Sequence, residues 1–328
     1  MRATLFWAVV ALGFTSSCEA DAREQAASSR EARKPGPAGG AAKGACKISA
    51  LPLRLPAPRR LVAIGDLHGD LSATRAALRA AGAIDERDRW VGGKLVVVQT
   101  GDVLDRGDDE QAILDLIAQL ETQARAAGGA FIALMGNHEL MNGALDFRYV
   151  TPGGFHDFDA PGVDAKVSPD VPAQARSRVA ALGAGGSYAR KLAQHAVVAI
   201  VGDTVFSHAG IEASWADRLP EANQAARCWM DGQTKDAPSA LTSDDSPVWT
   251  RAVGTSNVDC AQVAATLQAL KVKRMVVGHT VQKDGITSAC DGALWRIDVG
   301  MARHYGGPIE VLELTPTAPP KVLKGTRS

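Results

Sequence analysis

The chain has 328 residues, with 36 Lys and Arg balanced by 36 Asp and Glu, so its formal net charge is zero at pH 7. This balance argues against proteins that hold nucleic acid or an anionic membrane surface through overall positive charge, and we expect no nucleic-acid partner. Hydrophobic residues make up 46% of the chain, which is enough for a sizeable core in one large domain or two small ones.

The N-terminal residues have the pattern of a secretory signal. Arg2 precedes an apolar run at 5–14, which is too short to span a bilayer and is followed by small residues and Cys18. We therefore expect residues 1–17 to be a signal peptide and the protein to be exported to the periplasm or cell envelope. The letters FTSSC, ending at Cys18, also resemble a bacterial lipoprotein cleavage box, although Thr15 stands where that box usually has Leu. Membrane attachment is expected only through a lipidated Cys18.

Residues 18–45 differ in composition from the rest of the chain. They are rich in Ala, Gly, Arg, Glu and Pro and have almost no large apolar side chains, so they cannot bury enough surface to fold. We expect a flexible linker there. Residues 46–328 show no second break in composition and no internal repeat, which indicates a single catalytic domain.

Four cysteines lie in this domain, at Cys46, Cys228, Cys260 and Cys290. An even number in an oxidising compartment allows two disulfides, with three possible pairings. Of these we favour Cys46 with Cys290 and Cys228 with Cys260. The spacings contain no CxxC pair, so a structural zinc site is not expected.

Apolar runs alternate with helical patterns along the domain. Short buried strands are predicted at 61–64, 95–98, 131–134, 197–201, 205–206 and 275–277, and helices at 71–81, 110–126 and 258–270. This alternation indicates a layered α/β domain that binds its ligand beyond the carboxyl ends of the strands. The stretch 146–186 is rich in Gly, Pro and Asp without periodicity, so we expect a long loop that is either disordered or a lid over the site.

Polar clusters follow five of the predicted strands: GDLHGD at 65–70, GDVLDRGDD at 101–109, GNHE at 136–139, SHAG at 207–210 and GHT at 278–280. Carboxylate oxygens and imidazole nitrogens together suit first-row divalent metals, and the glycines let the backbone turn sharply. If the strands lie in one sandwich, the clusters meet at one edge. A strand-ending turn without metal is the structural alternative for any one of them.

The order of these motifs resembles the calcineurin-like metallophosphoesterases, in their phosphoprotein phosphatase branch. Longer stretches, GNHELMN, RYVTPGGF, SPVWTR and RIDVGM, are similar to the bacterial Shewanella-like protein phosphatases. The likeness extends from about residue 61 to about residue 313. It implies an α/β fold, a four-layer β-sandwich flanked by helices.

The resemblance implies a dinuclear metal centre with six ligands: Asp66 and His68 for one metal, Asp102 bridging both, and Asn137, His208 and His279 for the second. A carboxylate between two cations offsets their mutual repulsion, and two close metals can share a hydroxide at neutral pH. Oxygen and nitrogen donors accept two divalent or trivalent ions of Mn, Fe, Zn or Co, and Mn²⁺ is our working choice.

Four further residues are given catalytic roles by the resemblance. His138 would face the leaving-group oxygen as a general acid, and Asp105 would orient its imidazole. Arg106 would bind phosphate oxygens with its planar fork, and Arg251 would be a second clamp, unless it is a solvated loop residue.

Two positions depart from common patterns in the family. Met135 precedes GNHE where many phosphoprotein phosphatases have Arg, and Val281 follows GHT where many metallophosphoesterases have a further His ligand. The second departure favours a site of the protein-phosphatase type. Glu139 is expected to support the ligands from behind, and Asp70 is either such a partner or a helix N-terminal carboxylate.

We therefore expect an exported dinuclear-metal phosphomonoesterase that hydrolyses a phosphorylated protein or small phosphate ester in one step through a metal-bridging hydroxide. Likeness to the subfamily favours phosphotyrosine over phosphoserine and phosphothreonine. The enzyme alternative is a hydrolase of dinucleoside polyphosphates or other phosphodiesters, and the non-enzyme alternative is an inactive metal-binding sensor or scaffold. The oligomeric state is left open.

Overall fold

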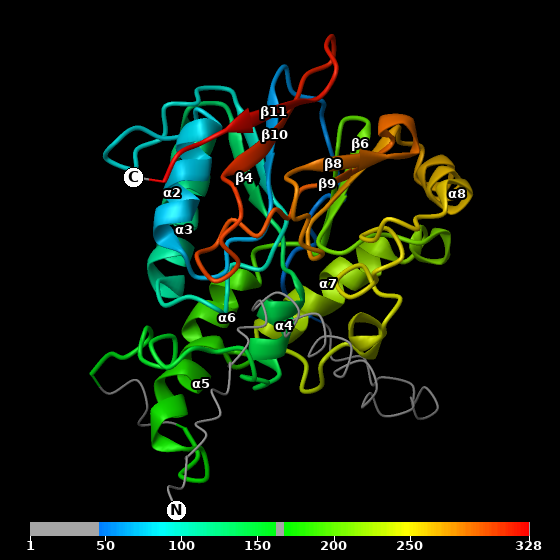
Figure 1. Cartoon of the computed structure of the whole chain (residues 1–328). Helices are drawn as coiled ribbons and strands as arrows, with labels where there is room; N and C mark the ends of the chain where they lie inside the picture. Colours follow the sequence, from blue (N-terminus) through cyan, green and yellow to red (C-terminus); the bar gives the residue numbers. More distant parts are fainter. Residues whose placement is uncertain (1–45, 162–166, 328) are drawn as a thin grey trace, which may run out of the picture. The chain divides into compact units, whose positions relative to one another are not determined.

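Two β-sheets face each other at the centre of the structure, a computed structural model that describes residues 46–161 and 167–327 (Figure 1). The predicted signal peptide 1–17, with the linker 18–45 and its Cys18, lies outside these described residues and stays a prediction. The described residues belong to one compact unit. No helix within 46–161 and 167–327 is long and apolar enough to cross a membrane.

One sheet has five strands in the order β11 (Lys321–Lys324), β10 (Glu310–Leu314), β2 (Leu61–Ile64), β3 (Val96–Gln99) and β4 (Ala130–Ala133). The other has six, in the order β1 (Arg54–Leu55), β5 (Val198–Val201), β6 (Thr204–Ser207), β7 (Arg274–Val277), β9 (Leu294–Arg296) and β8 (Thr287–Ala289). Strands β2, β3 and β4 run parallel, as do β6, β7 and β9. Each sheet therefore brings the carboxyl ends of three neighbouring strands to one edge.

The outer layers are helical. They comprise α2 (Leu71–Ala80), α3 (Glu110–Ala126), α4 (Asn137–Gly143), α5 (Arg176–Leu182), α6 (Ser187–Leu192), α7 (Leu219–Met230) and α8 (Cys260–Leu270), with short 3₁₀ turns at Ala173–Ala175, Ala213–Trp215, Ser239–Thr242 and Cys290–Gly292. In Figure 1, α2 and α3 lie beside the five-stranded sheet, and α8 lies on the opposite side of the molecule. The predicted four-layer α/β sandwich is confirmed.

The layers form because successive side chains along a strand pack against different neighbours on the two faces of the sheet. In β2, Val62 and Ile64 belong to the apolar cluster shared with α2 and α3, whereas Ala63 belongs to the cluster that also contains Phe206 and Val276 of the second sheet. Successive strand side chains point to opposite faces, so an apolar run buries both faces at once. Helix α2 begins at Asp70, whose side chain accepts the Ala73 N–H at 2.9 Å. Asp70 is therefore a helix cap, which resolves its open assignment.

Helix α5 corrects the prediction of a loop throughout 146–186. Its sequence, RSRVAAL, offers no clean apolar stripe because the buried face carries Arg178 beside Ala181 and Leu182. A pattern search that counts only apolar residues misses such a helix. Strands β1 and β8–β11 and helices α4, α6 and α7 were also not predicted.

Two disulfides join the four domain cysteines, as expected, but the favoured pairing was wrong. Cys46 is bonded to Cys228, and Cys260 is bonded to Cys290. Cys46 lies against α7, where Gln224 Nε2 is 3.4 Å from both sulfurs of that bridge. Cys260 is the first residue of α8, and Cys290 follows β8 as the first residue of the 3₁₀ turn Cys290–Gly292. Pairing follows this tertiary arrangement, which cysteine spacing does not encode.

We expect each bridge to stabilise the fold by about 2–4 kcal/mol, and Cys46–Cys228 to contribute about 1.5 kcal/mol more than Cys260–Cys290. The reason is loop length, because the sequence separations are 182 and 30 residues. Urea denaturation of the two double Cys→Ser variants measures both values. Equal losses, or a larger loss for the short loop, would contradict the chain-entropy argument.

Candidate active site

The predicted site residues follow the carboxyl ends of strands from both sheets. Asp66 and His68 come after β2, Asp102, Asp105 and Arg106 after β3, Asn137 and His138 after β4, His208 after β6, and His279 after β7. Parallel strands end at a common edge, and the edges of the two sheets meet, because His208 after β6 lies 3.1 Å from Asp102 after β3. The five polar clusters therefore converge.

One group of ligand atoms forms around Asp102. Its Oδ2 lies 3.8 Å from His68 Nε2 and 3.7 Å from His138 Nε2. These three residues offer atoms within 4.8 Å of one another, the spacing of a metal site. Asp66 Oδ2 lies 4.0 Å from His68 Nε2 and extends the same group.

A second group uses the same carboxylate. His208 Nε2 lies 3.1 Å from Asp102 Oδ2, 2.9 Å from Asn137 Oδ1 and 3.2 Å from His279 Nδ1. Asp102, His208 and His279 again offer atoms within 4.8 Å of one another. Asp102 therefore belongs to both groups, which is the arrangement that its predicted bridging role requires.

The tautomers of the histidines fit metal ions. His68 Nδ1 lies 3.0 Å from the Leu104 carbonyl, and His208 Nδ1 lies 2.9 Å from the Thr100 carbonyl. A carbonyl can only accept, so in the neutral ring Nδ1 carries the proton and Nε2 presents its lone pair to the acidic and amide oxygens. Buried lone pairs that face one another repel, so this donor set fits cations between them.

The pKa directions favour neutral imidazoles at His68 and His279 and oppose ionisation of the Asp66 carboxyl group. Burial and the neighbouring His138 lower the pKa of His68 to about 3, and burial lowers that of His279 well below its usual value. Burial and the nearby carboxylates of Asp298 and Asp102 raise the pKa of Asp66. Crowding of negative charge is what bound cations would offset.

Glycine is required where the ligands approach the backbone. A Cβ added at Gly136 would lie 2.2 Å from Asp102 Oδ1, and one added at Gly278 would lie 2.2 Å from Asp66 Oδ1. Both distances are far inside van der Waals contact, so the residue before each ligand has no room for a side chain. This is why GNHE and GHT begin with Gly.

Backbone strain gathers at the same place. Of the ten non-glycine residues with positive φ in the described part of the chain, five are predicted site residues: His68, Asp102, Asp105, Arg106 and His279. Non-glycine residues in this region cost about 1–3 kcal/mol each and persist only where the surroundings hold them. The strained turns aim short side chains at one point.

Glu139 stabilises these strained turns through hydrogen bonds to the backbone. Its buried carboxylate accepts the backbone N–H groups of Asp102, Val103, Leu104 and Gly136 at distances from 2.6 to 3.2 Å. It thereby joins the β3 turn to the start of α4, in the supporting position that we predicted for it.

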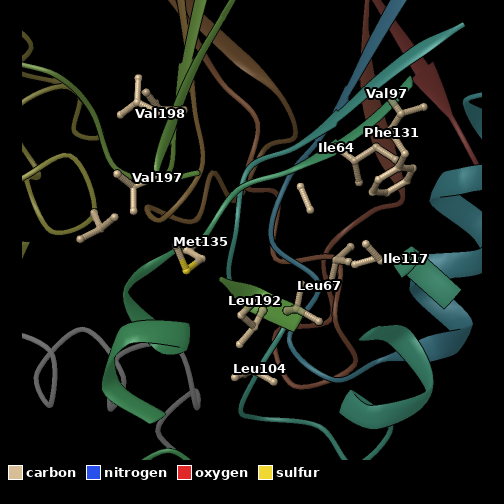
Figure 2. Close-up of a cluster of buried hydrophobic side chains, with 14 of the residues drawn as sticks. Ile64, Leu67, Val97, Leu104, Ile117, Phe131, Met135, Leu192, Val197 and Val198 are labelled. Carbon is tan, nitrogen blue, oxygen red and sulfur yellow. The ribbon is translucent and has the colours of Figure 1, made fainter. Parts of the chain in front are cut away.

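Apolar neighbours anchor the ligand turns in the core. Leu67 stands between Asp66 and His68, Leu104 precedes Asp105, and Met135 precedes GNHE. All three belong to one buried cluster, shown in Figure 2. The site is therefore built on turns whose apolar residues are packed, and Met135 occupies a core position rather than one that faces phosphate.

His138 and Asp105 form a close pair. His138 Nδ1 lies 2.6 Å from Asp105 Oδ2, and its Nε2 points toward Asp102. Burial opposes protonation of His138, but the charges of Asp102 and Asp105 outweigh it and raise the pKa of His138. Burial likewise opposes ionisation of Asp105, and the hydrogen bond from His138 outweighs it and lowers the pKa of Asp105. A protonated imidazole is thus favoured beside the metal ligands.

Arg106 and Arg251 are close enough to the candidate ligands for their charges to act on His68 and His279 respectively. The Arg106 guanidinium stacks over the ring of Tyr149 at 4.4 Å and lies 5.4 Å from that of Tyr305, and its Nη1 is 3.2 Å from His304 Nε2. Arg251 is exposed and donates to Thr280 Oγ1 at 3.3 Å, directly after the ligand His279. Both cations therefore border the ligand groups.

Several neighbours of the site were not predicted. They are Tyr149 and Tyr305 beside Arg106, Asn142 and Arg178 behind Asp105, and Asp298 near Asp66. Burial raises the pKa of Asp298 to about 6. Three of these residues lie inside the longer stretches that resemble the family: Asn142 in GNHELMN, Tyr149 in RYVTPGGF and Asp298 in RIDVGM. The sequence therefore contained a signal for these three, although it did not indicate their roles.

Two sheets flanked by helices, with His, Asp and Asn ligands on the strand ends, define a metallophosphoesterase. The chain belongs to the calcineurin-like phosphoesterase family, whose model matches residues 59–283. It is 39% identical over 301 residues to Shewanella-like protein phosphatase 2 of Arabidopsis thaliana, covering 80% of this chain and 77% of that protein. It is 28% identical over 262 residues to Shewanella-like protein phosphatase 1 of Plasmodium berghei, covering 76% and 69%.

Solved structures agree with this assignment. A cold-active protein tyrosine phosphatase of a psychrophilic Shewanella species superposes with a TM-score of 0.68 and 26% identity, over 84% of this chain and 83% of that one. A protein serine/threonine phosphatase from Saccharomyces cerevisiae, with a TM-score of 0.54 and 15% identity over 84% of each chain, shares the fold. The chain is a metal-dependent phosphoric ester hydrolase, as the sequence predicted.

Proposed function

We propose that the protein is an exported dinuclear-metal phosphomonoesterase that removes phosphate from phosphorylated proteins, with phosphotyrosine preferred. One observation carries the proposal: Asp102 is shared by two ligand groups, and His138 of the first group is paired through its other ring nitrogen with Asp105. A binding protein would need the ligands but not an acid, so this pairing argues against the inactive sensor or scaffold.

Each group of site residues has a separate role in the proposed reaction. Arg106 and Arg251 bind the phosphate oxygens, which places the phosphorus over the ligand groups. Two ions held by Asp66, His68, Asp102, Asn137, His208 and His279 would supply a hydroxide at neutral pH and polarise the phosphate. His138 gives its proton to the departing oxygen, and Asp105 keeps its imidazole oriented and charged. We keep Mn²⁺ as the working metal, because the donor set accepts it among other first-row ions.

The preference for phosphotyrosine rests on the aromatic rings beside Arg106 and His138. The rings of Tyr149 and Tyr305 flank Arg106, and the Tyr149 ring lies 5.1 Å from that of His138. An aromatic substrate gains stacking contacts on such walls that an alkyl phosphate does not gain. The structurally similar Shewanella enzyme is itself a protein tyrosine phosphatase.

We expect kcat/KM for a phosphotyrosyl peptide to exceed that for the matched phosphoseryl peptide by roughly 10-fold, and that for diadenosine tetraphosphate by more. The comparison uses Mn²⁺-loaded protein at matched concentrations of the three substrates. Preferred hydrolysis of the dinucleotide would replace the proposal by the diester alternative. Absence of hydrolysis on all three would favour the sensor or scaffold.

Export is supported by the cysteines. Two disulfides among the described residues are typical of proteins that fold in an oxidising compartment. Mass spectrometry of the mature N-terminus tests the proposal, because cleavage should leave a chain that begins at or near Cys18, with or without lipid. An intact Met1 on protein from the cell envelope would contradict it.

A further inference from the structure

We propose that Arg178 of α5 is a positioning residue that orients Asp105 and, through it, His138. The inference rests on the proposed acid role of His138. It also gives a function to α5, which lies within the stretch 146–186 that we predicted to be a loop. Arg178 is not in contact with the ligand groups, so it would act on the reaction only through the pair.

The side chain of Arg178 is completely buried and each of its nitrogens donates a hydrogen bond. Nη2 donates to Asp105 Oδ1 at 3.0 Å and to Glu110 Oε1 at 2.8 Å. Nη1 donates to the Gly154 carbonyl at 2.8 Å and also contacts Glu110 Oε2. Nε donates to Asn142 Oδ1 at 2.8 Å. A planar fork satisfied in this way has one orientation only.

As a result, the two carboxylate oxygens of Asp105 have different hydrogen-bond partners. Oδ1 accepts from Arg178 and from Asn142 Nδ2 at 2.9 Å, which leaves Oδ2 to meet His138 Nδ1. Because Arg178 Nε occupies the Asn142 oxygen, the Asn142 amide must turn its nitrogen toward Asp105. With Oδ1 held from two sides, rotation of the carboxylate away from the imidazole is blocked.

Glu110 completes the arrangement from the backbone side. Its Oε1 accepts a hydrogen bond from the backbone N–H of Asp105, whose φ is +67°. Both of its carboxylate oxygens also accept hydrogen bonds from the Arg178 guanidinium. Two buried carboxylates would repel each other without the guanidinium between them. Burial raises the pKa of Glu110 to about 7, and the Arg178 hydrogen bonds oppose that rise. Arg178 is therefore the link through which α5 holds both the turn and the acid pair.

The test compares Arg178→Lys with a matched control on the same helix, Arg176→Lys, and with His138→Asn. Lysine keeps the positive charge but cannot span Asp105, Glu110 and Asn142. Arg176 instead donates to the carbonyls of Pro169 and Val171, which are not site residues. Kinetics are measured on phosphoserine, phosphotyrosine and p-nitrophenyl phosphate with Mn²⁺-loaded protein.

For Arg178→Lys we expect kcat on phosphoserine to fall roughly 10- to 100-fold, phosphotyrosine to fall less, and the nitrophenyl ester to stay within about 3-fold, with KM unchanged. A second readout needs no metal: the downfield imidazole N–H proton of the His138–Asp105 bond in the apo protein. It should be absent in His138→Asn, displaced or broadened in Arg178→Lys, and unchanged in Arg176→Lys.

Equal losses on all three substrates, or an unchanged proton resonance, would make Arg178 a structural residue and overturn the inference. If His138→Asn itself shows no dependence on the leaving group, the acid role fails, and the proton resonance still decides whether Arg178 holds the pair. Should Arg178→Lys not fold, the double variant Arg178→Met with Glu110→Gln removes one charge of each sign. It should give the same order of losses and the same change of the resonance.

Discussion

Replacing His138 by Asn is expected to slow hydrolysis of phosphoserine by roughly 10²–10⁴-fold, because an alkoxide departs poorly without a proton. Phosphotyrosine, whose phenol has a pKa of about 10, should lose less. A nitrophenyl ester should lose least, since its anion is stable. The measurement is kcat/KM of the variant on the three esters, relative to the unaltered protein.

Metal content is the control for this variant. A histidine that binds a metal through Nε2 often has its Nδ1 held by a carboxylate, and His138 has this geometry. His138 also lies in one group with His68 and Asp102, so a role as a metal ligand has to be tested. If His138 is the acid, Asn leaves the bound metal near the level of the unaltered protein. Equal losses on the three substrates together with loss of metal would make His138 a ligand instead.

Replacing Asp102 by Asn is expected to reduce activity to the background of the assay and to lower the metal bound per chain. Asp102 Oδ2 lies between 3.1 and 3.8 Å from the Nε2 atoms of three histidines, so it is the only charge that both groups share within the described ligand clusters. An amide removes that charge and can place N–H groups against imidazole lone pairs. Elemental analysis and phosphopeptide hydrolysis measure the two effects.

Asp115→Asn is the matched control, because Asp115 is exposed on α3 and pairs with Lys191 away from the ligands. It should change neither metal content nor rate. An Asp102→Asn protein that is folded, active and fully loaded would show that the two groups do not depend on a shared carboxylate.

The fold could be predicted where apolar periodicity was strong. Helices α2 and α3 and strands β2, β3 and β4 lie within one or two residues of their predicted ranges, because each buries a continuous apolar pattern. Helix α5 was missed because a buried Arg interrupts its apolar face, and that Arg is satisfied only by residues far away in the chain. Long-range partners of this kind leave no local pattern.

In the candidate site, too, residues in local motifs could be predicted and residues with long-range partners could not. Asp66, Asp102 and His279 could be placed because each stands in a short motif directly after a strand, and strand ends meet at one edge. Arg178 lies 73 residues from Asp105, and Cys46 lies 182 residues from Cys228. Only the folded chain decides such pairs, which is why the disulfide pairing was wrong and Arg178 was unseen.

The most direct test of the central claim is a titration of the chelated, metal-free protein with Mn²⁺, in which phosphotyrosyl peptide hydrolysis is followed against equivalents added. A centre built on a carboxylate shared by two ligand groups predicts little activity at one equivalent and saturation at two. Full activity at one equivalent, or activity that persists without added metal, would contradict the dinuclear account.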